Sequence, residues 1–311
     1  MTSEDVVQDH PHRRIVRIGD TIRRPVQPWT ETVHALLRHL ESVGFPCAPR
    51  ALGFDTEGRE VLSYVEGEAG PAGWAKVADD RGLAAFARLL RDYHDATEDF
   101  SPPDGAVWAV ATEEAPAPGE ARARGAMRIL GEERASGEVR APGEARALGE
   151  VQAPGVMRAR GEVRAPGQVV CHGDFGPWNV VWQGSRPVGI IDFDFAHPAA
   201  RIDDVAYALE YVAPFRDDAE CLRWLSFPTP PDRRRRLELF CDAYGLSSAT
   251  GTFDAVVARQ ERNIALVRRL AGQGHEPQAS WVAEGILENL ESRVAWSRSH
   301  RHLFEKSPRS D

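Results

Sequence analysis

Apolar and polar residues alternate in two short runs near the N-terminus. The runs RIVRIG (14–19) and TIRRP (21–25) meet at Gly19 and Asp20, which are typical turn residues, and the second run ends at a proline. Alternation of this kind predicts β-strands with one buried face, and the short glycine-containing connection predicts that the two strands form a hairpin.

The pattern then changes to helical spacing and back again. Apolar residues recur every three or four positions over 29–45, and Gly44 stands where the helix should stop, which predicts an amphipathic helix. The segment 59–68 is predicted to be a strand that leads into a glycine-containing connector, and 82–97 is predicted to be a second amphipathic helix. The predicted order is therefore a hairpin, a helix, a strand, a connector and a helix.

Between about 110 and 167 the chain has little that it can bury. Glycine recurs at every sixth position from 119 to 167, and units such as GEVRAP combine Glu, Arg, Ala and Pro. A hexapeptide β-helix is the ordered alternative, but the position that should hold a bulky aliphatic residue includes Ala, Met, Val and Glu. The composition favours a flexible insert that is dispensable for folding and chemistry.

After residue 167 the pattern predicts a β-hairpin followed by helices. Apolar strands over 179–183 and 187–195 flank the turn residues 184–187. If the turn is symmetric, facing residues have numbers that sum to 371, which places Asn179 opposite Asp192. The remaining apolar periodicity is helical, over 203–214, 233–246, 252–274 and 279–297.

Composition and charge limit the class of protein. The chain has 311 residues, a net charge of -9 and an isoelectric point near 5.6, so it lacks the surplus of cations that binding to nucleic acid or to an anionic membrane requires. No apolar run approaches the ~20 residues of a membrane helix, and the N-terminus lacks the apolar centre of a signal peptide. We therefore expect a soluble, cytoplasmic protein without nucleic-acid or membrane partners.

The cysteines and a run of four arginines are expected to be structural. Cys47, Cys171, Cys221 and Cys241 are far apart in the sequence and form no CxxC pair, so buried free thiols are expected rather than disulfides or a zinc site. Residues 233–236, all arginine, open a predicted helix, where a solvated helix face is expected.

The stretch CHGDFGPWNVVW (171–182) places an acid and two polar groups directly before an apolar strand. Asn179 offers an amide oxygen and Asp192, on the facing strand, offers a carboxylate; both are hard oxygen ligands of the kind that Mg²⁺ takes. Asp174 can reach the same volume from the loop, and its carboxylate can accept the proton of an attacking hydroxyl. These three residues predict a metal-assisted phosphotransferase site.

Together the motifs resemble the aminoglycoside phosphotransferase and choline kinase-like family. HGDFGPWN is similar to the family's HxDxxxxN catalytic loop, IDFD to its metal-binding motif, and RIDDVAYAL to the later segment that steadies the loop. VLSYVEGE resembles the hinge, and TIRRP resembles the strand that bears the phosphate-binding cation. The resemblance implies an α+β, two-lobed protein kinase-like fold, with a small β-rich N-terminal nucleotide-binding lobe and hinge (1–66) and a larger, mainly helical C-terminal lobe (67–311).

The resemblance also implies a role for each position of the catalytic motifs. Asp174 would be the catalytic base, and His172 would hold the catalytic loop through its ring nitrogens. Asn179 and Asp192 would bind Mg²⁺, and Asp204 would steady the catalytic loop.

On the nucleotide side the sequence departs from the family in three places. No convincing glycine-rich loop precedes RIVRIG, and the cation is an arginine, Arg23 or after a slip of one residue Arg24, rather than a lysine. Val33 occupies the helical position from which a glutamate would pair with that cation. The hinge residues expected to contact ATP or GTP are Ser63, Tyr64 and Val65.

Three further acids lie at the end of the metal-binding motif or after it. Asp194 stands where the family often has glycine, and solvent exposure is expected for it rather than a role as a second metal ligand. Asp203 and Asp204 stand at the start of a predicted helix, where a capping role is expected rather than contact with substrate.

The function implied is transfer of the γ-phosphoryl group of ATP or GTP, with Mg²⁺, to a hydroxyl of a small molecule. An aminoglycoside-like antibiotic and an amino-alcohol or sugar metabolite both remain as acceptors, because no motif of the helical lobe fixes the choice. The alternative is a nucleotide-binding pseudokinase or regulatory module without transfer activity. The intact set of Asp174, Asn179 and Asp192 favours the enzyme.

Overall fold

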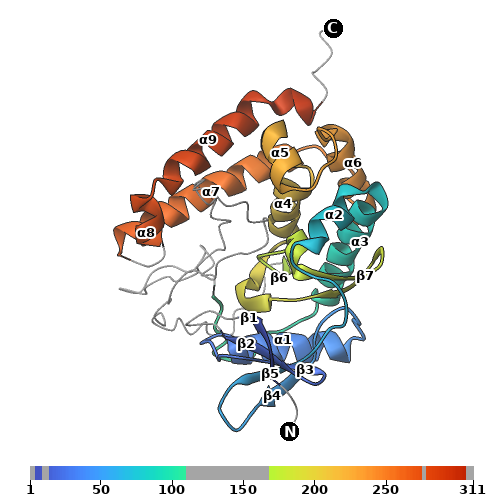
Figure 1. The fold of residues 1–311 in the computed structure, drawn as a ribbon, viewed down its shortest axis with the longest axis vertical. Coiled ribbons are helices and arrows are strands. Elements are labelled where there is room, and N and C mark those ends of the chain that lie inside the picture. The colour runs from blue at the N-terminus through green and yellow to red at the C-terminus, as the bar shows by residue number, and fades with distance from the viewer. Residues whose placement is uncertain (1–3, 9–13, 110–167, 275–277, 306–311) are drawn as a thin grey trace.

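The computed structural model describes residues 4–8, 14–109, 168–274 and 278–305. A β-sheet with one helix forms the N-terminal region, and the rest of the chain is mostly helical (Figure 1). The predicted insert at about 110–167 lies outside the described residues.

The N-terminal sheet is antiparallel, with the strand order β1-β2-β3-β5-β4. Its strands are β1 (Glu4–Gln8), β2 (Ile15–Ile18), β3 (Thr21–Arg24), β4 (Ala51–Phe54) and β5 (Glu60–Ser63). The predicted hairpin is β2–β3, and Gly19 in its turn has a φ of 59°, a conformation that glycine adopts without strain. The sequence did not predict β1 or β4. Most of β1 is exposed, so its sequence lacks the alternation of apolar and polar residues that predicts a strand.

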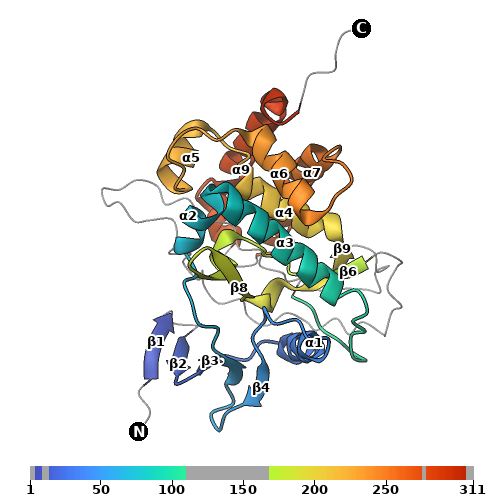
Figure 2. The ribbon, with the colours of Figure 1, turned by 90° about the vertical axis from the view of Figure 1, so that its right-hand side faces the viewer.

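Helix α1 (Thr30–Ser42) packs on this sheet through one apolar face. Its buried positions include Val33, Leu36, Leu37 and Leu40, and the three-to-four spacing of these residues is the pattern that predicted the helix. The sheet and α1 lie together at one end of the molecule, below the helical part in Figure 2.

The larger part begins with α2 (Ala72–Ala78) and α3 (Asp80–Ala96). After the insert come the paired strands β6 (Gln168–Cys171) and β9 (His197–Ala200), which enclose the hairpin of β7 (Val180–Gln183) and β8 (Arg186–Ile190). The remaining helices are α4 (Arg201–Val212), α5 (Asp218–Trp224), α6 (Arg233–Tyr244), α7 (Thr252–Gly272), α8 (Gln278–Ala283) and α9 (Ile286–Ser299). Helices α2 and α5 were not predicted. The single helix predicted over 279–297 is divided near Gly285, whose φ of 87° is left-handed.

The predicted register of the β7–β8 hairpin was wrong. Gln183 pairs with Arg186, so the turn contains only two residues, and an irregularity between Val181 and Trp182 shifts the pairing again. As a result the backbone N–H of Ile191 donates to the carbonyl of Asn179 at 2.9 Å. The residue across from Asn179 is therefore Ile191 and not Asp192.

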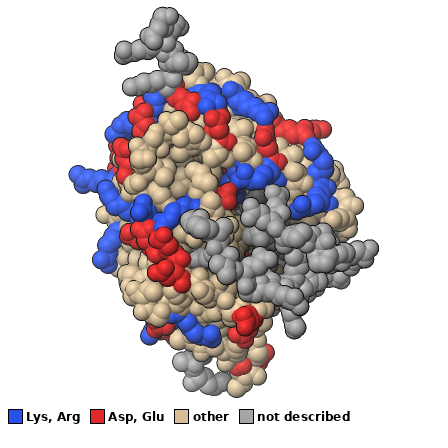
Figure 3. All heavy atoms as spheres, turned by 180° about the vertical axis from the view of Figure 1, so that it is seen from behind, with Lys and Arg blue, Asp and Glu red and all other residues tan. Residues whose placement is uncertain are grey.

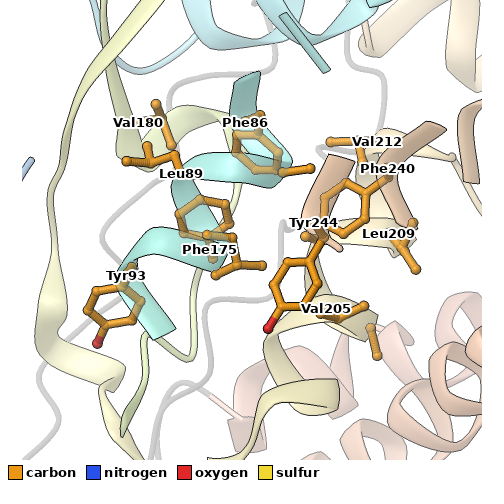
Figure 4. Close-up of a cluster of buried hydrophobic side chains, with 14 of the residues drawn as sticks. Phe86, Leu89, Tyr93, Phe175, Val180, Val205, Leu209, Val212, Phe240 and Tyr244 are labelled. Carbon is orange, nitrogen blue, oxygen red and sulfur yellow. The ribbon is translucent and has the colours of Figure 1, made fainter. Parts of the chain in front are cut away.

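The main core lies between α3, α4 and α6 and reaches the loop that carries Asp174 (Figure 4). The ring of Phe86 on α3 lies 4.5 Å from that of Phe175, measured between centroids, and 6.4 Å from that of Phe240 on α6. Phe175 directly follows Asp174 and is fully buried. Burial of this aromatic ring anchors the loop beside the acid.

The solvated helix face predicted for residues 233–236 was wrong for two of the four arginines. Arg233 and Arg236 are each 4% exposed. Arg236 donates to the carbonyls of Val212, Ala78 and Val77 at 2.7, 2.9 and 2.6 Å, at the ends of α4 and α2. Burial lowers the pKa of Arg236 to about 10. An arginine stem can lie in a core when its head group binds carbonyls that a helix end leaves without partners, and a run of arginines in a sequence does not reveal this.

The four cysteines are free thiols, as predicted; Cys171, Cys221 and Cys241 are buried and Cys47 is partly buried. Burial raises the pKa of Cys221 and of Cys241 to about 11, which keeps both in the less reactive thiol form. Within the described residues, none of the helices is both long and apolar enough to cross a membrane. The face seen in Figure 3 shows basic and acidic side chains interspersed.

Candidate active site

Asp174 lies in the loop between β6 and β7 and is 1% exposed. The amide Nδ2 of Asn179 donates to the carboxylate Oδ2 of Asp174 at 2.8 Å and to its backbone carbonyl at 2.9 Å. The hydroxyl of Tyr207, on α4, donates to the other carboxylate oxygen, Oδ1. Both oxygens of the candidate base are thus held in place by donors from two elements.

His172 connects this loop to Ile191, the first residue of the predicted metal-binding motif. Its ring Nε2 lies 3.0 Å from the carbonyl of Ile191, and its Nδ1 lies 3.3 Å from the backbone nitrogen of Asp174. The geometry fits a neutral ring that donates from Nε2 and accepts at Nδ1. The ring is fully buried and packs edge-on against Phe193 at 4.9 Å between centroids. These contacts are those expected of a residue that holds the loop.

Asp204 accepts hydrogen bonds from the loop backbone. Its carboxylate binds the N–H of His172 at 2.6 Å and the N–H of Gly173 at 2.9 Å, and Nε2 of His94 lies 3.0 Å away. Burial would raise the pKa of Asp204, but the hydrogen bond from His94, the charge of His94 and the backbone donor of Gly173 hold it below its ordinary value.

The loop also needs a glycine at position 173. Gly173 has a φ of 78°, and a Cβ there would lie 2.2 Å from the carbonyl oxygen of Phe195, so a larger residue would strain the backbone and push the two segments apart.

Neither of the two acids that were expected to cap a helix caps α4. That helix begins after Ala200 without a side-chain cap, and Asp203 and Asp204 lie in its first turn. Asp203 pairs with Arg262 at 2.9 Å on the surface. The carboxylate of Asp204 is directed to the catalytic loop instead.

The structure distinguishes the two arginines of β3. Arg24 is 7% exposed, and its Nη1 lies 3.6 Å from Oδ1 of Asp192 in the other lobe. Successive strand residues point to opposite faces of a sheet, and Arg23 pairs with Asp55 at 3.5 Å on the other face. The structure therefore places Arg24 beside Asp192 and Arg23 away from it. Asp192 itself has a φ of 66°, which is unusual for a residue with a side chain.

The partner of Arg24 that was missing from α1 comes from β5. Glu60 lies directly opposite Arg24 in the β3–β5 register, and its Oε2 accepts a hydrogen bond from the Arg24 Nε. The Oε1 of the same carboxylate lies 2.9 Å from Nε2 of His34, on α1. Burial would raise the pKa of Glu60, but the hydrogen bond from His34 and the charge of Arg24 lower it. The sequence contains both Arg24 and Glu60, but their pairing can be recognised only when β5 is known to lie beside β3.

The exposure predicted for Asp194 was wrong. Asp194 is 6% exposed, and its Oδ1 lies 2.9 Å from Nη2 of Arg24. The pKa of Arg24 is lowered by burial, but the carboxylates of Asp194, Glu60 and Asp192 together raise it above its ordinary value. The chain bends into a short 3-10 helix at Phe193–Phe195, which brings Asp194 back toward the arginine.

Of the hinge residues, Ser63 ends β5, Tyr64 and Val65 follow it before α2, and Val65 packs closely on β8. The N–H of Tyr64 donates to the carbonyl of Asp20 at 2.8 Å, and the guanidinium of Arg17 lies 3.7 Å from the centre of the Tyr64 ring. A Cβ at Gly189 would lie 2.6 Å from Cγ1 of Val65. A hollow of about 600 Å³ borders Ser63, Tyr64, Val65 and Glu66, but Asp174, Asp192 and Arg24 do not line it, so it is separate from the candidate site.

Asn179 and Asp192 each offer an oxygen ligand that suits a magnesium ion. The Nδ2 of Asn179 is used by Asp174, which leaves the amide oxygen of Asn179 as an acceptor, and Asp192 contributes a carboxylate. Both are the oxygen ligands that Mg²⁺ prefers. A second group, His94, Cys171 and Asp204, has ligand atoms within 4.8 Å of one another, but Asp204 already accepts hydrogen bonds at both oxygens.

Solved structures with similar folds are kinases of small molecules. The GDP complex of aminoglycoside 2'-phosphotransferase-IIIa matches with a TM-score of 0.52 and 15% identity, over 94% of this chain and 92% of that one. Amicoumacin kinase hAmiN, in complex with AMP-PNP, Ca²⁺ and Ami, matches with a TM-score of 0.51 and 14% identity, over 95% and 88%. A choline/ethanolamine kinase family protein from Mesorhizobium loti matches with a TM-score of 0.50 and 13% identity, over 96% and 92%. The fold is therefore the predicted two-lobed protein kinase-like fold.

A curated relative is more similar in sequence. The trifolitoxin immunity protein of Rhizobium leguminosarum bv. trifolii is 32% identical over 236 residues, which are 75% of this chain and 70% of that protein. A model of the phosphotransferase enzyme family matches residues 6–239, more than half of the chain. The chain belongs to the phosphotransferase enzyme family.

Proposed function

We propose that this protein transfers the γ-phosphoryl group of ATP or GTP to a hydroxyl of a small molecule. The observation that carries the proposal is the arrangement of two charged groups. A buried carboxylate, Asp174, is held by Asn179 and Tyr207 in the large lobe, and the guanidinium of Arg24 in the small lobe reaches Asp192 at 3.6 Å. Such an arrangement can hold a nucleotide's phosphates beside a general base.

Each residue then has a defined task. Asp174 accepts the proton of the acceptor hydroxyl as the oxygen attacks. Arg24 donates to phosphate oxygens, which a guanidinium does well because its donors form a planar fork. Asn179 and Asp192 would hold Mg²⁺, which when bound neutralises charge on the transferred phosphoryl group.

The acceptor that we propose is an antibiotic or toxin, so that phosphorylation protects the cell that makes the enzyme. The support is the relative named as an immunity protein against trifolitoxin, together with two structural neighbours named for the antibiotics that they phosphorylate or bind. An amino alcohol is the second acceptor class, and its support is the fold shared with the choline/ethanolamine kinase family protein.

The direct test is an assay of ADP and GDP release with purified full-length protein. ATP or GTP is supplied with Mg²⁺, and a panel of hydroxyl-bearing antibiotics, amino alcohols and sugars is screened. Acceptor-dependent release, with a phosphorylated product detected by mass spectrometry, supports the proposal. Nucleotide binding without transfer to any member of the panel, and without basal hydrolysis, would favour the regulatory alternative.

A further inference from the structure

We infer that Asp194 is a positioning residue that directs Arg24 toward the nucleotide and keeps the guanidinium from pairing more closely with Asp192. The inference rests on the proposed function, because it assigns Arg24 to the phosphates. It concerns a carboxylate for which the catalytic motifs require no role.

The geometry shows a guanidinium held at both ends. Glu60, from the same lobe as Arg24, accepts from the Nε side, and Asp194, from the large lobe, lies 2.9 Å from Nη2. Asp192 lies farther away, at 3.6 Å from Nη1. The Arg24 side chain therefore spans the boundary between the lobes, and its closer partner in the large lobe is Asp194.

This division of partners has a consequence for the metal site. A guanidinium distributes its donors over several directions, so Arg24 can bind Asp194 through Nη2 while Nη1 remains available for a phosphate oxygen. Without the charge of Asp194, the guanidinium would turn to Asp192, which among the described residues is the other carboxylate of the large lobe within 4 Å of it. Arg24 would then be misdirected, and Asp192 would be less available to a metal ion.

The direction in which nucleotide affinity changes when Asp194 is neutralised separates a positioning role from simple electrostatics. Asp194 adds a negative charge near the expected place of the phosphates, so its neutralisation should by Coulomb's law alone strengthen nucleotide binding. The positioning role predicts weaker binding.

The experiment compares Asp194→Asn with the matched control Asp203→Asn, an exposed acid of the same lobe whose partner is Arg262. Dissociation constants for ADP and GDP are measured by calorimetry on the full-length chain, with and without Mg²⁺, together with the melting temperature. We expect Asp194→Asn to bind roughly 3- to 30-fold more weakly, Asp203→Asn to bind like wild type, and Asp194→Glu to recover part of the loss.

The same substitution in an Arg24→Met background tests whether the effect passes through Arg24. If it does, Asp194→Asn adds no further weakening there. Unchanged or tighter binding by Asp194→Asn, or an equal loss in both backgrounds, would overturn the inference. If Asp194→Asn does not fold, Asp194→Ser is measured in the same way and judged by the same outcomes.

The two proposals fail in different ways. Wild-type protein that transfers phosphate while Asp194→Asn binds nucleotide equally well would overturn only the role of Asp194. Wild-type protein that binds no nucleotide would overturn both.

Discussion

The hydroxyl of Tyr207 donates a hydrogen bond to Oδ1 of Asp174, although the two residues lie 33 positions apart. Burial and the charge of Asp174 raise the pKa of Tyr207 well above its ordinary value, so the phenol remains a donor at neutral pH. The guanidinium of Arg259 lies 4.0 Å from the centre of the tyrosine ring and pairs with Glu210 at 3.0 Å. Helix α4 therefore holds the candidate base through Tyr207, and α7 packs on that tyrosine through Arg259.

Asp174→Asn should abolish phosphoryl transfer and leave nucleotide affinity within a few-fold of wild type. The substitution removes the proton acceptor but keeps the shape of the side chain, and loss of a general base typically costs about 10²- to 10⁴-fold. Turnover and nucleotide affinity are measured separately. Near wild-type turnover in the variant would show that Asp174 is not the base.

Tyr207→Phe should lower kcat roughly 10- to 100-fold, because a carboxylate displaced by a fraction of an ångström no longer meets the hydroxyl correctly. Nucleotide affinity should not change. Tyr211→Phe is the matched control, since Tyr211 belongs to the same aromatic cluster and has no hydrogen bond to Asp174 among those of the described residues. Equal effects of the two substitutions would indicate a general loss of packing.

The contact of Asn179 with Asp174 could be anticipated from the sequence because it depends on local spacing. Asn179 lies five positions after Asp174, and the intervening loop allows the amide to reach the carboxylate whatever the register of the following hairpin. The predicted pairing of Asn179 with Asp192 failed because a two-residue turn and an irregular pair shifted the strands. The apolar pattern of the hairpin does not record such a shift.

The network around Arg24 could not be anticipated, because it depends on which strands are neighbours. Glu60 meets Arg24 only because β5 pairs with β3, although β4 and α1 lie between them in the sequence. Asp194 reaches the same arginine from the other lobe. The charge of a residue in the sequence does not show whether it is buried, and this also explains the wrong prediction for Arg233 and Arg236.

Asp192→Ala should impair transfer more than Asn179→Ala, because it removes the charged ligand of a hard cation. Raising Mg²⁺ should partly restore Asn179→Ala and scarcely restore Asp192→Ala. The restoration of Asn179→Ala will be incomplete, since its Nδ2 also holds Asp174. Transfer rates are measured over a Mg²⁺ titration. A Mg²⁺ dependence like that of wild type in both variants would exclude these residues as ligands.

Arg236→Met should destabilise the fold by about 3 kcal/mol, because it leaves three carbonyl oxygens, two of them in buried contacts, without their donor. Those carbonyls lie at the ends of α2 and α4, so transfer kinetics should change little at temperatures where the variant is folded. Arg234→Met, at a partly exposed position of the same run, should change the free energy of unfolding by no more than about 0.5 kcal/mol. Urea unfolding measures both. Equal stabilities would show that solvent replaces the lost donors.

Asp204 should make the stability of the protein depend on pH in the acid range. Its pKa in the folded state is lowered from the ordinary value of 3.8, so the folded protein binds the proton less readily than the unfolded chain. The stabilisation from this carboxylate is therefore fully present above the unfolded pKa and is lost as the pH falls through the folded value. The loss should begin below about pH 5.

Asp204→Asn should remove this dependence and should be less stable than wild type at neutral pH. An amide cannot accept at both positions, so its NH₂ group would face one of the loop donors, the N–H of His172 or of Gly173. The free energy of unfolding in urea is measured from pH 3.5 to pH 7 for wild type, Asp204→Asn and the exposed control Asp203→Asn. The wild-type and Asp203→Asn curves should fall more steeply toward low pH than the Asp204→Asn curve. Parallel curves for all three would mean that the hydrogen bonds of Asp204 to the loop do not depend on its charge, and that the acid sensitivity arises elsewhere.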